Sequence, residues 1–259
     1  MNSWLNLIKK EYRMSRKSIL TILVMMLIVG LWLMYSNRQH MGIIFAPASL
    51  LVFFALVYPA IFMFSSVSKE LKNTSHLWLH CPQPAWMLLT AKLLMAVIYM
   101  LLFLLLAASG VYIGLFLGQW PHGASMTTEQ MALIITELGL YASLAITVAA
   151  LYLASWSTLI VVVSATVRNW LGRFHRLASL AVFLVATWGM GWVYNSWLFT
   201  RVTQWGSFEI KPLSLRYLSL ASQDFGGPVI YTGQIVAIIL AIVAIFALAT
   251  WLIDNKVEV

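Results

Sequence analysis

The sequence predicts an all-α polytopic membrane protein with six transmembrane helices, and three observations predict this class. Of the 259 residues, 62% are hydrophobic and only 9% are charged, whereas soluble domains average roughly 45–50% apolar and about 25% charged residues. The mean hydropathy is +0.88. The few charged residues stand in clusters between long apolar runs, which is the arrangement that membrane spans require.

Six apolar stretches are long enough to cross a hydrocarbon core of roughly 30 Å at about 1.5 Å per helical residue. The first lacks a small-residue cleavage pattern at its far end, so we expect an uncleaved span rather than a signal peptide. The fourth is too long for one straight span, and its polar stretch Ser155-Trp156-Ser157-Thr158 predicts a kink or a cytoplasmic extension. The six expected spans are 19–36, 43–66, 91–116, 131–164, 177–199 and 229–253.

Lys and Arg are distributed unevenly between alternate loops, and this predicts an orientation. Five of them precede the first span, three lie in the second loop, three lie in the fourth loop and one follows the last span, so 12 share one side. The opposite side holds four, namely Arg38, Arg201, Lys211 and Arg216. Because basic residues are retained in the cytoplasm, we expect both termini to be cytoplasmic.

Charge and motifs argue against several other classes. The formal net charge of +8 comes from short groups beside the spans rather than from one basic face, so we expect contacts with membrane lipids and no nucleic acid. The sequence has no His-Glu-x-x-His, Gly-x-Ser-x-Gly or Gly-x-x-x-x-Gly-Lys-Ser/Thr motif, so we expect no catalysis by this chain itself. His76, His80 and Cys81 have no evident fourth ligand, so we expect no metal site.

Residues 1–17 are expected to form a cytoplasmic amphipathic helix. Trp4, Leu5, Ile8 and Tyr12 fall near one helical face, whereas the basic residues lie mainly elsewhere. This pattern is typical of a helix in the membrane interface. Two roles stay open for it: a plain positive-inside anchor, or a surface that also touches a partner.

Residues 67–90 form the most informative loop. The second span continues into it as a charged helix with Glu70, which is followed by Thr74, a hydrophobic turn at Leu77 to Leu79, Pro82, and Lys92 at the start of the third span. In this order of residues the chain resembles the ABC type-2 permeases, the membrane subunits of a large class of bacterial exporters. The layout of an amphipathic N-terminal helix, six spans and a longer outer segment is similar too. An ordinary helical hairpin loop is the alternative.

The resemblance implies that residues 1–259 form a single transmembrane permease domain of a bacterial plasma membrane. It implies a short coupling helix that docks on a separate nucleotide-binding subunit, and this ATPase subunit carries the ATP and Mg. It also implies a second permease chain, identical or related. The residues expected to contact the ATPase are Glu70, Thr74, Leu77, Trp78, Leu79 and Pro82. A second inner loop is a further candidate docking point, with Arg168, Arg173 and Arg176.

Three residues within the spans are candidates for a transport path: Glu137, Trp188 and Trp192. Charge inside a membrane is costly and usually functional, although Glu137 lies only about two turns from the outer-loop residue Glu129 and an interfacial position is favoured. The two tryptophans could line a cavity or pack against lipid. The outer segment 200–228 is expected to be interfacial and partly re-entrant, because irregular backbone does not survive in hydrocarbon, and the resemblance implies that it caps the path.

Six spans alone do not identify an energy source, so other functions stay open. A secondary transporter or channel is the main alternative. Against it stand the lack of evident paired charges within the spans and of inverted repeats with broken helices. A non-transporting membrane assembly or sensor protein is a further alternative. The cargo, and the choice between homodimer and heterodimer, do not follow from the sequence.

Overall fold

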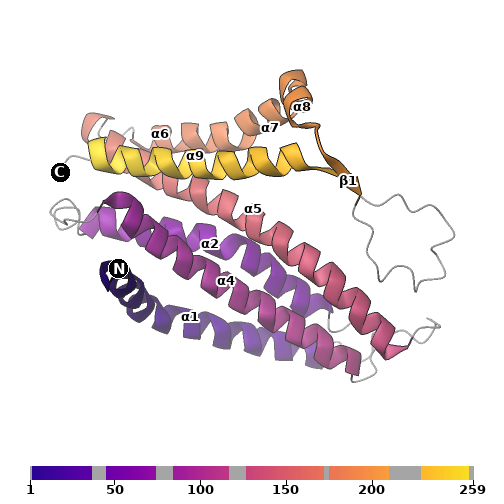
Figure 1. Cartoon of the computed structure of the whole chain (residues 1–259). Helices are drawn as coiled ribbons and strands as arrows, with labels where there is room; N and C mark the ends of the chain where they lie inside the picture. The colour runs from indigo at the N-terminus through magenta and orange to yellow at the C-terminus, as the bar shows by residue number, and fades with distance from the viewer. Residues whose placement is uncertain are drawn as a thin grey trace.

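The computed structural model describes residues 2–36, 45–73, 84–116, 127–171, 175–209 and 229–256, and this part of the chain is almost entirely helical (Figure 1). A π-helical segment joins α6 to α7, and two short strands precede α9. The elements are α1 (Asn2–Ser36), α2 (Phe45–Asn73), α4 (Ala85–Phe116), α5 (Thr128–Leu171), α6 (His175–Leu184), η2 (Val185–Gly189), α7 (Met190–Tyr194), α8 (Trp197–Thr203), β1 (Ser207–Glu209), β2 (Val229–Tyr231) and α9 (Thr232–Lys256).

Four helices in the described part of the chain are long and apolar enough to cross a membrane. They cover Pro47–Lys72, Ala85–Phe116, Thr128–Val167 and Thr232–Asn255. Many of their large apolar side chains are exposed, as expected for surfaces that face lipid. The predicted all-α class is therefore confirmed, and the four long apolar helices are compatible with a membrane protein, whereas the count of six spans stays a prediction.

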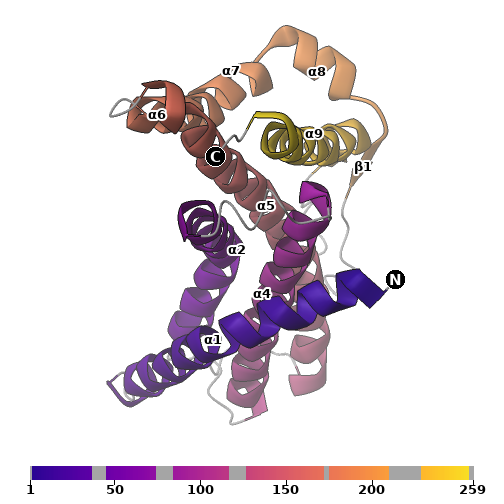
Figure 2. The ribbon, with the colours of Figure 1, turned by 90° about the vertical axis from the view of Figure 1, so that its left-hand side faces the viewer.

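The long helices run along the long axis of the molecule, and both chain ends lie at the same end of the bundle (Figure 1). α1, α2 and α4 form one side of the molecule, and α9 lies with α6 and α7 on the other side, with α5 between the two groups (Figure 2). α2 and α5 form the most extensively packed pair of helices. The ends of α2 and α9 and the starts of α1 and α4 therefore lie close to one another, which positions the site described below.

Two apolar cores hold the bundle together. The first joins α1, α2, α4 and α5 and includes Met100 and Phe103, both completely buried. The second joins α2, α4, α5 and α9 and includes Met63, Val162 and Ala249, also completely buried. Because α2, α4 and α5 contribute to both cores, these three helices connect the two halves of the bundle.

α5 is one helix of 44 residues, which extends past the expected span 131–164. The polar stretch from Ser155 to Thr158 does not break it, because the hydroxyls of these two residues donate to carbonyls one turn earlier, at 2.9 and 2.8 Å. Ser157 donates to the Ala60 carbonyl of α2 at 2.7 Å. The polar stretch therefore bonds α5 to α2, and α5 continues past the expected span to Leu171, while a cytoplasmic position of this continuation stays a prediction.

The expected span 177–199 differs from a continuous α-helix. α6 ends at Leu184, η2 forms a wider turn of five residues, and α7 ends at Tyr194 before the chain turns into α8. A π-helical turn accommodates an inserted residue, and apolar content alone does not reveal it. Residues 210–228, most of the segment expected to be re-entrant, lie outside the described residues.

The start of α9 is joined tightly to the end of α8. Gly206 has a φ of 66°, which glycine adopts at little cost, and its carbonyl accepts bonds from the Thr232 N–H at 3.1 Å and from the Thr232 hydroxyl at 2.7 Å. A Cβ added at Gly233 would overlap the Thr203 carbonyl and the Trp205 indole nitrogen, so a side chain at this position would collide with both. The junction depends on these two glycines.

Candidate functional site

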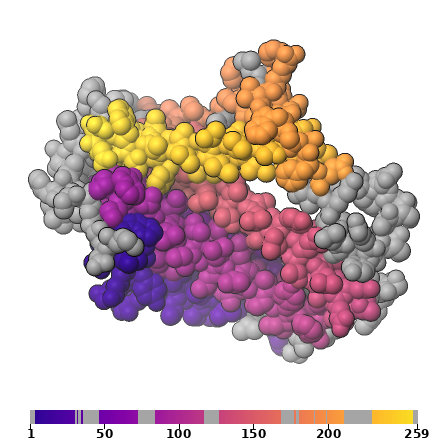
Figure 3. Space-filling model, in the orientation of Figure 1, coloured from indigo at the N-terminus to yellow at the C-terminus, as the bar shows by residue number. Residues whose placement is uncertain are grey.

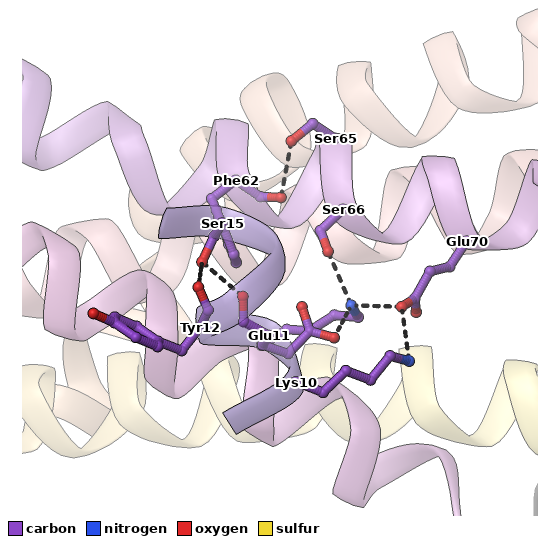
Figure 4. Close-up of polar contacts among 9 residues, drawn as sticks. Lys10, Glu11, Tyr12, Ser15, Phe62, Ser65, Ser66 and Glu70 are labelled. Carbon is purple, nitrogen blue, oxygen red and sulfur yellow. Dashed lines mark hydrogen bonds and ion pairs between the residues drawn. The ribbon is translucent and has the colours of Figure 1, made fainter. Parts of the chain in front are cut away.

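A cluster of charged side chains is buried where α1, α2 and α4 meet (Figure 4). The Lys92 ammonium of α4 lies 2.7 Å from Glu11 Oε1 of α1 and 3.0 Å from Glu70 Oε1 of α2. Lys92 also donates to Ser66 Oγ of α2 at 2.9 Å, and Lys10 Nζ lies 3.8 Å from the same Glu70 oxygen. We call these five residues the charge cluster.

The charge cluster is balanced in charge and withdrawn from solvent. Lys92 is 1% exposed, Glu11 6% and Glu70 8%, whereas the Lys10 side chain reaches in from the surface. Moving an unpaired charge from water into a protein interior costs several kcal/mol. Two carboxylates facing two ammonium groups offset this cost. Because both carboxylates share Lys92, the arrangement depends on that residue.

Helical spacing explains why these side chains meet. On α1, Glu11, Ser15 and Ile19 are four residues apart and all buried, so they form one face of the helix. On α2, Ser66 and Glu70 share a face for the same reason. The face of α1 that packs on α4 therefore carries polar side chains, whereas Leu5 and Tyr12, on the apolar face expected in the membrane interface, are both more than half exposed.

A hydroxyl pair continues the contact between α1 and α4. Ser15 Oγ donates to the Glu11 carbonyl at 2.7 Å, which leaves the Tyr99 hydroxyl as the donor in the 2.6 Å bond between Ser15 and Tyr99. Tyr99 packs edge-on against Tyr58 of α2, and Tyr58 packs edge-on against Phe103. Tyr99 therefore belongs both to the polar contact with α1 and to the first apolar core.

The charge cluster lies at the root of the inner loop. α2 ends at Asn73, and α4 begins at Ala85. The Ala85 N–H donates to Asp254 Oδ1 of α9 at 3.2 Å. Segment 74–83 lies outside the described residues, but the two helix ends that carry it are fixed to α1 through the charge cluster and to α9 through Asp254.

Only one of the residues expected to contact an ATPase is described. It is Glu70, whose carboxylate is directed to Lys92 within this chain. Arg168 belongs to α5 and Arg176 to α6, and the structure describes only their backbone. The described residues contain no group of three potential metal ligands. The residues of the inner loops that lie outside the described ones are Thr74, Leu77, Trp78, Leu79, Pro82 and Arg173, together with His76, His80 and Cys81.

A large apolar cavity lies between α5 and α9. Its volume is about 1120 Å³, and η2, α7, α8, β1 and β2 complete its wall. Figure 3 shows β1 and the adjacent end of α9 standing apart from α5 on this side of the molecule. Most lining side chains are apolar, among them Leu144, Val148, Val193, Phe199 and Ile238. The cavity provides room for a ligand within one chain.

The cavity lies beside the expected path residues but does not include them. Trp188 and Trp192 are 80% and 81% exposed, and neither lines the cavity, whereas their neighbours Thr187 and Gly191 do. Glu137 is partly buried in α5 and does not line the cavity either. The structure does not bring Glu137, Trp188 and Trp192 together around this space.

No protein-family model, curated protein or solved structure matches this chain. The charge cluster and the cavity therefore have to be interpreted from their own chemistry, and the resemblance to ABC type-2 permeases stays an expectation.

Most of the charge cluster was missed by sequence reasoning. Glu70 and Lys92 stand out in the sequence as parts of one loop motif, whereas Glu11 was not among the candidate residues. A signal was present, because Glu11 is the single acidic residue among the first 17, which carry five Lys and Arg. A buried carboxylate needs a partner of opposite charge, but the sequence alone does not say that Glu11 is buried.

Proposed function

We propose that the chain is the membrane-spanning permease subunit of an ATP-driven exporter of the ABC type-2 class, with six spans and both termini in the cytoplasm of a bacterial plasma membrane. α1 and the run from α6 to α7 would supply the two spans beyond the four apolar helices. Two observations support this layout: both chain ends lie at one end of the bundle (Figure 1), and 12 of the 16 basic residues are predicted to lie on that side.

The position of the charge cluster at the root of segment 74–83 carries this proposal. A force on a loop moves helices only when the loop is rigidly joined to them. Lys92 links α4 to α1 through Glu11 at 2.7 Å and to α2 through Glu70 at 3.0 Å. A displacement of the segment is therefore passed to three helices together, which supports a mechanical role for the loop.

In the proposed mechanism, segment 74–83 docks on the ATPase subunit through Leu77, Trp78 and Leu79. Glu70 anchors the segment through Lys92 instead of touching the ATPase itself. ATP-driven closure of two ATPase subunits pushes on this segment and on the second inner loop, and the helices then change which side of the path is open. The ATP and Mg stay on the ATPase subunits, and a second permease chain completes the path.

Site-specific photocrosslinking tests this docking. A photoreactive amino acid replaces Trp78 in the inner loop, and in a control variant it replaces Trp188, which is 80% exposed and belongs to the proposed fifth span. We expect the first variant to crosslink to a protein that hydrolyses ATP and the second to crosslink to lipid alone. A Trp78 variant that inserts normally but crosslinks only to lipid contradicts the docking.

A transporter driven by an ion gradient is the second candidate, and the charge cluster favours it too. Ionisable groups buried in membrane proteins commonly mark proton or ion pathways, and Lys92 and Glu11 form a buried ion pair where α1 meets the start of α4, beside the expected spans and not in the middle of them. The purified chain reconstituted alone into vesicles distinguishes the candidates. Proton uptake into the vesicles that Glu11→Gln abolishes supports the ion-driven transporter. Vesicles that take up no protons support the exporter subunit.

A further inference from the structure

We propose that the outward side of α1 binds phospholipids whose headgroup has a net negative charge, such as phosphatidylglycerol. The binding residues are four exposed basic side chains of α1, which we call the basic face: Lys9, Arg13, Arg16 and Lys17. The proposal rests on α1 being a membrane span, as proposed above. It does not rest on the exporter role, because lipid binding involves no ATPase.

α1 is one unbroken helix from Asn2 to Ser36, so the basic face and the expected first span belong to the same rigid element. The helix lies at the outside of the bundle, where it packs on α4 and α2 (Figure 2). Its buried residues Glu11, Ser15 and Ile19 face these neighbours. The opposite side of α1 is therefore available to the surroundings.

An exposed stripe runs along this outward side of α1 and changes its chemistry once. Its members follow one another at intervals of three or four residues, so they share one side of the helix. The first three are basic, and the next three are apolar and 46–63% exposed. The change from charged to apolar side chains marks the level at which α1 would enter hydrocarbon. The stripe consists of Lys9, Arg13, Lys17, Leu20, Val24 and Ile28.

The charges of the basic face are not balanced within the part of the chain that the structure describes. Lys10 lies 3.8 Å from Glu70 Oε1, whereas none of the four basic-face residues forms an ion pair there. Glu11 is the single acidic residue among the first 17, and Lys92 already holds it at 2.7 Å. An anion from outside the chain would complete the charge balance.

The position of the basic face favours a lipid headgroup as this anion. Arg13 and Lys17 are separated by about 6 Å along the helix axis, and the headgroup layer on each side of the hydrocarbon is roughly 5–8 Å thick. Guanidinium groups bind phosphate oxygens with two parallel hydrogen bonds. A zwitterionic headgroup carries its own ammonium, which weakens this attraction, so the basic face should select headgroups with a net negative charge.

Native mass spectrometry of the full chain in mild detergent tests the proposal. The protein is mixed with equal amounts of phosphatidylglycerol and phosphatidylcholine that carry the same acyl chains. We expect the wild type to bind phosphatidylglycerol about tenfold more than phosphatidylcholine. Arg13→Gln should lower this preference about fivefold, whereas Arg13→Lys keeps the charge and should keep the preference.

Arg201→Gln is the matched control for net charge. Arg201 is also an exposed arginine, but it belongs to α8, which lies far along the bundle from the N-terminus (Figure 1). This variant should bind the two lipids as the wild type does. A loss of preference as large as that of Arg13→Gln would show that net charge, and not the basic face, selects the lipid, and would overturn the proposal.

Two further results would also overturn the proposal. One is equal binding of both lipids by the wild type. The other is displacement of phosphatidylglycerol by an equal concentration of inorganic phosphate, because the basic face would then bind free phosphate instead of a lipid held by its acyl chains. None of these measurements involves the ATPase partner, so the lipid proposal can fail while the exporter role stands.

Discussion

Lys92 and Glu11 are 81 positions apart in the chain, yet their side chains form a buried ion pair of 2.7 Å. Because Glu70 shares the same ammonium at 3.0 Å, the pair joins α1, the end of α2 and the start of α4. The inner loop is thus attached to a fixed group of three helices, and the proposed coupling depends on this attachment.

Replacing Lys92 should be the most damaging change in the charge cluster. Lys92→Met leaves two buried carboxylates facing each other without their shared cation, and we expect a loss of about 3–5 kcal/mol in the free energy of unfolding. Lys69→Met is the matched control, since Lys69 is exposed on α2, and it should change stability by less than about 0.5 kcal/mol. Thermal unfolding in detergent, followed by circular dichroism, checks both; equal stability of the two variants would contradict the assignment.

Exchanging the charges of the ion pair should restore part of the lost stability. Lys92→Glu alone brings three carboxylates together, whereas adding Glu11→Lys returns a cation to the same place between α1 and α4. We expect a favourable coupling energy of about 0.5–3 kcal/mol in the double-mutant cycle, measured by the same unfolding experiment. A double variant no more stable than Lys92→Glu would show that the two residues do not interact.

The hydroxyl pair of Ser15 and Tyr99 should contribute less. Ser15→Ala and Tyr99→Phe each remove one partner of the 2.6 Å bond, at an expected cost of about 0.5–1.5 kcal/mol. Because the two changes remove the same bond, the double variant should lose little more than either single one. Strict additivity of the two losses would mean that the bond does not form.

Two glycine substitutions should act in opposite directions. Gly233→Ala places a methyl group against the Thr203 carbonyl and the Trp205 indole, and we expect overpacking to cost about 1–3 kcal/mol. Gly110→Ala in α4 meets open space and should stabilise the helix by about 0.5–1 kcal/mol. The difference in melting temperature between the two variants checks this, and a stabilising Gly233→Ala would refute the described junction of α8 and α9.

The membrane class and most of the long helices could be predicted from the sequence, because the length of an apolar run can be read directly from the order of the residues. The second, third, fourth and sixth expected spans correspond to α2, α4, α5 and α9. The fifth expected span is interrupted by a π-helical turn at Val185–Gly189. Such a turn does not change the apolar content of the segment, so the sequence did not reveal it. The sequence also did not decide whether the helix continues through Ser155. The Ser155 hydroxyl can donate to the carbonyl one turn earlier only after the helix has formed.

The candidate site was predictable only in part. Glu70 and Lys92 are separated by a short loop, so their proximity follows from a helical hairpin. Glu11 meets them through the packing of α1 on α4, and no local pattern encodes this long-range contact. The cavity depends on alanines from α5 and α9, and their placement opposite one another requires the tertiary fold. The segment around Trp188 was identified, but the residues that line the cavity are its neighbours.

Purification of the tagged chain from its native membranes in mild detergent tests the exporter proposal most directly. The proposal predicts a stoichiometric partner subunit with ATPase activity, retained by the wild type and lost when Leu77, Trp78 and Leu79 are all replaced by serine, with membrane insertion unchanged. A clean single-chain species that transports on an ion gradient without ATP would contradict it.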